Sequence, residues 1–158
     1  MLDMDQAKNL SLKMELLWWV ITGLIIAAII YPILNYTTDY PFLLLNIMYI
    51  VIFITFSRYI FLLKHTFLAN AQLLKVAIIL LSIPIIAYLI NGIHYFQTYI
   101  DENGMEALFG DNSINQIQMG NFIRNELILF GVGSVIAAII LPFRLVISLW
   151  RWKNRGTV

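Results

Sequence analysis

Four long segments without a single charged side chain constrain this chain more than any other feature. They are residues 16–34, 41–57, 76–93 and 127–143, and they contain 19, 17, 18 and 17 residues. As helices they would be roughly 25 to 28 Å long, close to the thickness of about 30 Å of a bilayer's hydrocarbon core. Hydrocarbon offers backbone groups no partner, so a spanning segment must be a helix or part of a closed barrel, and these segments are continuously apolar rather than alternating. The sequence therefore predicts four transmembrane helices.

The composition agrees with a chain that lies in lipid. Of its 158 residues 61% are hydrophobic and 12% are charged, whereas soluble domains have about 25% charged residues. We therefore expect a single membrane domain over residues 1–158, an all-α integral membrane bundle of four helices. The expected helices are residues 16–35, 41–64, 75–95 and 126–143, with a loop at 96–125 and a basic amphipathic extension at 144–155.

The distribution of positive charge predicts the orientation of this bundle. If both termini and the middle connection share one side, that side holds nine of the ten Lys and Arg residues, and Arg124 alone lies opposite. Insertion keeps positively charged flanks in the cytoplasm, so both termini are predicted to be cytoplasmic (N-in, C-in). This clear asymmetry in a small chain favours a multi-pass protein of a bacterial inner (plasma) membrane. Asp3, Asp5 and Glu15 precede the first segment and no small-residue cleavage site follows it, so we expect a mature helix rather than a signal peptide.

The predicted outer loop of about 30 residues, 96–125, is far longer than the usual two to eight residues between bundle helices. That length suggests a folded outer element or a surface for a partner. Its acidic residues invite comparison with a calcium loop starting at Asp101, but an EF-hand would need glycine where Glu106 stands and glutamate where Asn112 stands. We therefore expect an acidic, solvated loop.

Charged residues border the apolar segments at the predicted inner side, and three of them form a candidate cluster. Arg58 and Arg144 directly follow the second and fourth segments, and Glu15 directly precedes the first. Charges at membrane depth are costly and usually pair or extend to the interface. One hypothesis is that Glu15 pairs with Arg58 or with Arg144, and the alternative is that each side chain reaches interfacial water separately.

The segment after the fourth apolar stretch has a polar stripe. Continued as a helix at about 100° per residue, Arg144, Ser148, Arg151 and Arg155 fall within a narrow sector. Such a stripe suits anionic lipid headgroups or an acidic partner, and it also suits ordinary anchoring of a cytoplasmic helix end.

Polar side chains near the predicted outer side form a second candidate group. The spacing of three and four residues predicts one helix face for Tyr88, Asn91 and Tyr95, with Asn46 and Tyr49 on the preceding helix at comparable depth. Together they could line a shallow cavity for a headgroup, a quinone or a small solute. Interhelical hydrogen bonding is the alternative interpretation.

Small residues predict where helices approach closely. Gly23 and Ala27 in the first helix, and Gly133 and Ala137 in the fourth, have the spacing of four that permits close backbone contact. Either these two helices touch each other there, or each faces another protein.

No catalytic pattern occurs in the sequence. The chain has no cysteine, no phosphate-binding glycine loop and no His-Glu metal motif, and His65 and His94 fall at opposite membrane ends. We expect no enzyme activity, no cofactor, no metal site and no nucleic-acid partner. The leading hypothesis is a subunit or accessory component of a larger membrane assembly, in contact with lipids and with other membrane chains or further copies of itself. The alternatives are a small oligomeric transporter or channel for an ion or small molecule, and a lipid- or quinone-binding membrane protein.

Overall fold

The computed structural model describes residues 2–109 and 116–154, with side chains described from Leu12 onward. The long elements are α1 (Leu2–Tyr36), α2 (Leu43–Leu62), α3 (Gln72–Asn103) and α4 (Gln116–Asn154), and short 3₁₀ turns are η1 (Leu63–His65), η2 (Phe67–Ala69) and η3 (Met105–Leu108). No strand occurs in these described ranges, which confirms the all-helical prediction.

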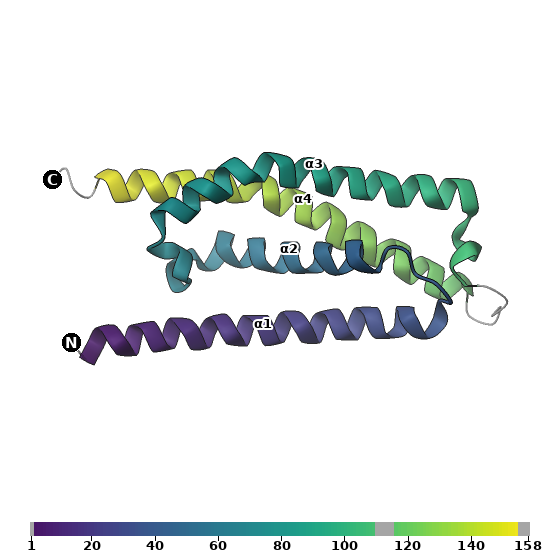
Figure 1. Cartoon of the computed structure of the whole chain (residues 1–158), viewed down its shortest axis with the longest axis horizontal. Coiled ribbons are helices and arrows are strands. Elements are labelled where there is room, and N and C mark those ends of the chain that lie inside the picture. Colours follow the sequence, from purple (N-terminus) through teal and green to yellow (C-terminus); the bar gives the residue numbers. More distant parts are fainter. Residues whose placement is uncertain (1, 110–115, 155–158) are drawn as a thin grey trace.

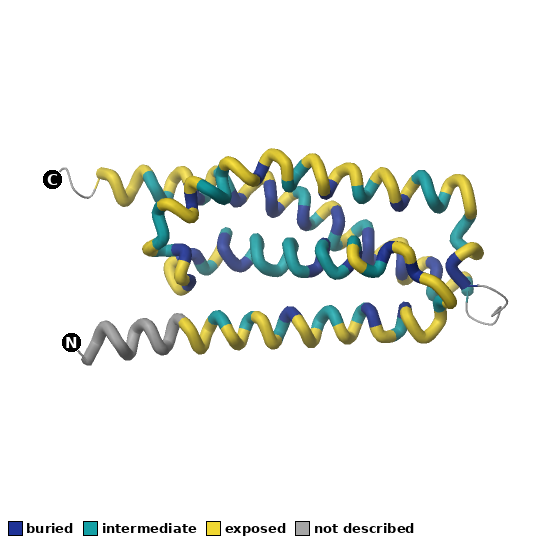
Figure 2. The backbone as a smooth tube through the Cα atoms, viewed as in Figure 1, coloured by how far each residue is buried: buried dark blue, intermediate teal, exposed yellow. Residues whose placement is uncertain are grey.

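Each long helix contains a stretch that is long and apolar enough to cross a membrane. These stretches are Leu12–Tyr36, Leu43–His65, Gln72–Asn103 and Gln116–Asn154. In the most apolar part of each, only 17%, 28%, 17% and 39% of the residues are buried within the protein. Exposed positions run along the length of the bundle (Figure 2). They include large apolar side chains such as Phe61 and Ile83. A surface of this kind suits lipid and would be unfavourable in water.

Consecutive helices run antiparallel, so each end of the bundle collects a different set of connections (Figure 1). The described ends of α1 and α4 near the chain termini lie at one end together with the α2–α3 connection, and we name it the termini end. The α1–α2 and α3–α4 connections lie at the other, the loop end. The termini and the middle connection were predicted to share one side, and the described helix ends are grouped in this way.

Helix α4 is the centre of the packing. Its main neighbours are α2 and α3, whereas α1 makes a much smaller interface with the rest of the bundle. Glycines make the close approach to α2 and α3 feasible. A Cβ atom at Gly133 would lie 2.8 Å from Phe53 Cδ2 on α2, and one at Gly131 would lie 3.2 Å from Ile93 Cγ1 on α3.

The two small-residue pairs therefore do not meet. Gly133 and the buried Ala137 face the interior of the bundle, and the close neighbour of Gly133 is α2 rather than α1. On α1, Ala27 is exposed and Gly23 has no neighbouring heavy atom within 4 Å of its Cβ position. The direct α1–α4 contact proposed for these residues is thus wrong, because α2 occupies the face of α4 that Gly133 presents.

Most of the sequence expected as an outer loop is helical. Helix α3 continues to Asn103 and α4 already begins at Gln116, with η3 between them. Apolarity indicates only the part of a helix that can lie in hydrocarbon, so the polar ends of α3 and α4 gave no such signal. At the other end α4 continues without interruption to Asn154, as the expected amphipathic extension requires.

An aromatic cluster fills the bundle at the loop end. The fully buried Phe42 ring, just before α2, lies 5.0 Å from the ring centroids of both Phe96 and Tyr99 on α3, with near-perpendicular planes. Tyr40 contacts the same ring from the α1–α2 connection at 6.0 Å. Edge-to-face contacts of this kind are favourable beyond their buried area and hold the α1–α2 connection against α3.

Candidate functional site

A cavity of about 560 Å³ opens at the termini end. It lies where the turns η1 and η2, the start of α3 and the end of α4 meet. Its lining residues are Leu63, Lys64, Ala69, Asn70, Gln72, Lys75, Arg144, Ser148, Arg151 and Trp152. Among the described residues, the lining contains four basic side chains and no carboxylate, so it concentrates positive charge.

Lys75 forms the floor of this basic cavity. The residue is 1% exposed, and its Nζ donates to the Ala69 carbonyl oxygen at 2.7 Å, to Gln72 Oε1 at 3.0 Å and to Ser148 Oγ at 3.1 Å. A lysine ammonium has three donors, so all of them have neutral oxygen partners. The lysine joins η2, α3 and α4, and its positive charge is not compensated by any of these hydrogen bonds.

Arg144 is held in a similar way. Its Nε donates to the Ile60 carbonyl oxygen on α2 at 3.1 Å, which leaves other guanidinium N–H groups for other acceptors. Ser148 and Arg151 follow on the same side of α4 and line the same cavity. The structure thus brings three of the four predicted stripe residues together, and Arg155 lies outside the described residues.

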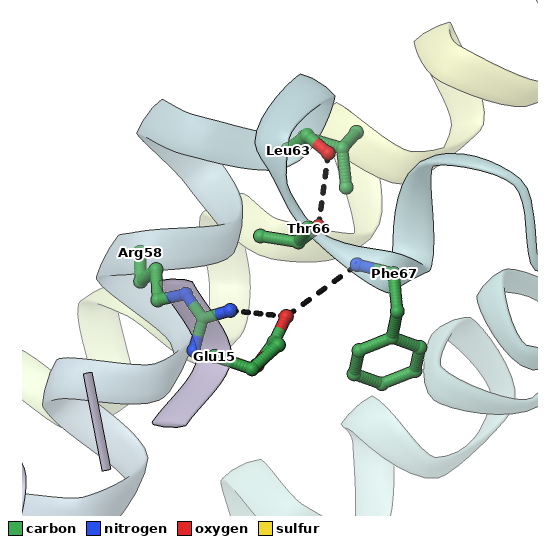
Figure 3. A network of polar contacts seen from close by, with 5 residues as sticks. All are labelled: Glu15, Arg58, Leu63, Thr66 and Phe67. Carbon is green, nitrogen blue, oxygen red and sulfur yellow. Dashed lines mark hydrogen bonds and ion pairs between the residues drawn. The ribbon is translucent and has the colours of Figure 1, made fainter. Parts of the chain in front are cut away.

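Glu15 and Arg58 form an ion pair at the termini end, in which Glu15 Oε1 contacts Arg58 Nη2 (Figure 3). The two side chains are 16% and 5% exposed. Arg58 also lies beside the rings of Trp18 and Tyr59, at 6.0 and 5.5 Å from their centroids. The same Glu15 oxygen accepts a hydrogen bond from the Phe67 backbone N–H at 3.4 Å. Of the two partners considered for Glu15, the structure selects Arg58.

The ion pair links α1 to α2, and the Glu15 carboxylate also contacts the α2–α3 connection at Phe67. Thr66 lies next to Phe67 between η1 and η2, and its hydroxyl donates to the Leu63 carbonyl oxygen at 2.9 Å (Figure 3). Glu15 therefore reaches both α2 and the turn that follows it. This contact makes Glu15 a polar attachment of α1, whose interface with the rest of the bundle is otherwise small.

The five residues expected to line an outer cavity do not face one common space. Asn46 and Tyr49 are buried between helices, and the Tyr49 hydroxyl donates to the Leu89 carbonyl oxygen at 2.8 Å. Tyr88, Asn91 and Tyr95 are exposed on α3. They share a helix face as the spacing predicts, and that face is largely exposed, although the Tyr95 ring also lies against Phe42. For Tyr49 the structure agrees with the interhelical hydrogen-bonding interpretation.

Comparison with protein families, with curated proteins and with solved structures finds no match to this chain. Within the described ranges, no three His, Cys, Asp or Glu side chains come close enough to hold a metal ion. The chemistry of the chain's own side chains is therefore the basis for a functional interpretation.

Sequence reasoning missed a buried carboxyl group at the loop end. Glu126 is 6% exposed, and its Oε1 accepts a hydrogen bond from Asn46 Nδ2 on α2. The same amide nitrogen donates to the Tyr40 hydroxyl at 3.1 Å. Glu126 directly precedes the fourth apolar segment, and the charge pattern of the sequence places it at the outer side with the acidic residues of the loop. Its position seven residues before Gly133 is the signal that could have placed it on the inward face of α4.

Proposed function

We propose that this chain is a non-catalytic membrane component whose basic cavity binds the phosphate-containing headgroup of an anionic lipid. The observation that carries the proposal is the convergence of Lys64, Lys75, Arg144 and Arg151 on one cavity without a carboxylate in its lining. Lys75 donates to neutral oxygens, so none of these partners carries a negative charge that would compete with an anion. Guanidinium and ammonium groups together are well suited to phosphate oxygens.

The position of the cavity favours a lipid over a free ion. The cavity lies at the end of an apolar bundle surface, and Leu63 and Trp152 contribute apolar atoms to its lining. Tryptophan is typical of headgroup depth. With both termini in the cytoplasm, as the charge distribution predicts, the cavity would face the leaflet surface where anionic lipids attract basic residues at about 1 kcal/mol per residue.

The test is retention of lipid by purified protein. Wild type and a Lys64→Gln/Arg151→Gln variant are placed in nanodiscs of phosphatidylcholine and phosphatidylglycerol, and bound lipid is counted by native mass spectrometry. Two exposed charges at about 1 kcal/mol each correspond to a roughly thirtyfold loss of affinity for phosphatidylglycerol. Lys13→Gln, an exposed lysine on α1 outside the cavity, is the matched control.

Two results separate the alternatives in this experiment. Equal retention of phosphatidylglycerol by the double variant and the control would refute the proposal. Displacement of the lipid by millimolar inorganic phosphate, together with phosphate binding in phosphatidylcholine alone, would instead assign the cavity to a free anion.

A second candidate, membership of a larger membrane assembly, is favoured by the open face of α1. Gly23 has no neighbour within 4 Å of its Cβ position and Ala27 is exposed, so a partner helix has room for close approach. Gly23→Leu should leave the isolated chain at least as stable as wild type but abolish co-purification of partners from native membranes. Ile83→Leu, at an exposed position on α3, is the control. Partner recovery unchanged by Gly23→Leu would exclude this face.

The proposed orientation and location can be tested with single cysteines, because the chain has none of its own. His65→Cys lies at the termini end and Glu102→Cys near the loop end, and both positions are exposed. In a bacterial inner membrane with cytoplasmic termini, an impermeant maleimide added to spheroplasts should label Cys at 102 and should reach Cys at 65 only after permeabilisation. The reverse pattern would invert the proposed topology.

A further inference from the structure

The buried polar group at the loop end has an imbalance of hydrogen-bond donors and acceptors. Glu126 Oε2 and Asn46 Oδ1 are both buried and have no hydrogen-bond partner. Both atoms are acceptors when the carboxyl is ionised, so neither can satisfy the other. An ionised Glu126 supplies no hydrogen-bond donor. In the part of the chain that the structure describes, these two acceptors therefore lack a donor that a proton on Glu126 would provide.

The surroundings of Glu126 do not compensate a negative charge. Its hydrogen bond comes from a neutral amide, and Arg124 on the same helix is exposed. From α1, the buried residues nearest the core of this end are the apolar Ile30 and Ile33. An ionised carboxylate in such a place is expensive unless it is paired or neutralised.

Among the described residues, the titratable side chains gathered around this site are phenols. Burial, and then the Glu126 carboxylate, raise the pKa of Tyr40, which lies outside the spanning segments. From α3, the rings of Tyr95 and Tyr99 lie against Phe42 in the same aromatic cluster. Phenols are neutral at physiological pH, so they supply hydrogen-bond donors and no positive charge.

We propose that Glu126, Asn46 and Tyr40 form a proton-binding site in which a proton taken up by Glu126 Oε2 is shared in a hydrogen bond with Asn46 Oδ1. In the ionised state, Asn46 Nδ2 donates to Glu126 Oε1 and to the Tyr40 hydroxyl oxygen, as in the structure. When hydronium at the loop end transfers a proton to Glu126 Oε2, the new carboxylic O–H donates to Asn46 Oδ1. The hydrogen bonds from Asn46 Nδ2 to Glu126 Oε1 and to the Tyr40 hydroxyl oxygen remain in place.

This exchange is chemically balanced and local. One O–H bond breaks in hydronium and one forms on the Glu126 carboxyl, with no change of oxidation state. An amide presents an acceptor on one side and donors on the other, so Asn46 can donate to one oxygen of a protonated carboxyl and accept from the other without turning. Because Asn46 belongs to α2 and Glu126 to α4, proton uptake would change the interaction between two helices with an extensive mutual interface.

The test uses infrared spectroscopy on the full chain in nanodiscs, with carbon-isotope-labelled glutamate, over a pH series. The expected result is a carboxylic-acid C=O band that appears and disappears along its own titration curve and is missing from Glu126→Gln. Glu102→Gln, at an exposed acidic position near the same end, should retain that band. A titrating band that is identical in Glu126→Gln and wild type would overturn the proposal.

A second variant keeps the test decisive if Glu126→Gln fails to fold. Asn46→Asp preserves the size of the side chain but replaces the amide with a second carboxyl, so the two groups should share one proton and titrate in two separate steps. A single step, unchanged from wild type, would overturn the proposal. Loss of the acid band on addition of sodium at constant pH would also overturn it, in favour of a metal cation at the same oxygens.

Discussion

Replacing Gly92 with alanine tests the closest approach of α3 to α2. A Cβ atom at this position would lie 2.5 Å from the Tyr49 hydroxyl oxygen and 2.6 Å from Leu45 Cδ1. Crowding of this degree costs about 1 to 3 kcal/mol, and the lower backbone entropy of alanine returns about 0.5 to 1 kcal/mol. We therefore expect Gly92→Ala to lower the free energy of unfolding by up to about 2.5 kcal/mol.

A double-mutant cycle with Tyr49→Phe identifies the cause of this loss. The phenylalanine lacks the clashing oxygen, and the next ring atom, Cζ, lies 3.4 Å from the added Cβ, which is ordinary contact. Tyr49→Phe alone removes the hydrogen bond to the Leu89 carbonyl oxygen, at a cost of about 0.6 kcal/mol and at most about 1.7 kcal/mol. The double variant should then lose about 1 kcal/mol less than the sum of the two single changes.

The measurement is reversible unfolding in mixed micelles with increasing dodecyl sulfate, followed by tryptophan fluorescence and circular dichroism. Gly23→Ala is the matched control, because no heavy atom lies within 4 Å of its Cβ position and only the favourable entropy term of about 0.5 to 1 kcal/mol applies. Additive losses within about 0.5 kcal/mol would refute the reasoning, since the hydroxyl would then not be the group that alanine meets.

Three further changes test other contacts by the same unfolding assay. Glu15→Gln leaves the guanidinium of Arg58 unpaired and should lower the free energy of unfolding by up to about 3 kcal/mol. The double variant Glu15→Gln/Arg58→Met should recover most of that loss. Equal stability of the single and double variants would exclude the ion pair as the cause. Gly133→Ile should destabilise the α2–α4 interface by at least about 1 to 3 kcal/mol whereas the exposed Val132→Ile should not, and similar values for both would place the helices too far apart for contact. Lys75→Met removes three hydrogen bonds and should lower the free energy of unfolding by roughly 1 to 3 kcal/mol. The α2–α3 connection should then be cleaved faster by protease. If the variant resisted protease as wild type does, this lysine would not hold the turn.

Apolarity alone predicted the number and approximate position of the spanning helices. A segment such as 76–93 contains no charge over 18 residues, and only one class of structure satisfies its backbone in lipid. The full lengths of the helices did not follow, because α3 continues to Asn103 through residues polar enough to resemble a loop. Hydropathy reports the solvent of a segment, whereas the end of a helix depends on capping and on local conformation.

Helix neighbours were only partly accessible from the sequence. From the sequence, Glu15 could pair with Arg58 or Arg144, or all three side chains could reach interfacial water separately, because each borders an apolar segment at the same predicted side. That argument could not choose between pairing and solvation, or between the two arginines. The choice depends on which helices are adjacent. The open position of Gly23 and the crowded one of Gly133 have the same sequence pattern, and only the packing around α4 separates them.

The two polar sites differ in how the protein treats a buried charge, and this difference makes the two proposals independent. Lys75 and Arg144 donate to neutral oxygens such as those of Ala69 and Ile60, so their positive charge remains available to an anion from outside. Glu126 instead receives one neutral donor and retains an unpartnered oxygen, so its charge is most simply removed by a proton. The sites lie at opposite ends of the bundle. Neutralising the cavity should therefore leave the infrared acid band unchanged, and Glu126→Gln should leave lipid retention unchanged. If either change altered both readouts, a rearrangement of the whole bundle rather than local chemistry would have to connect the two ends.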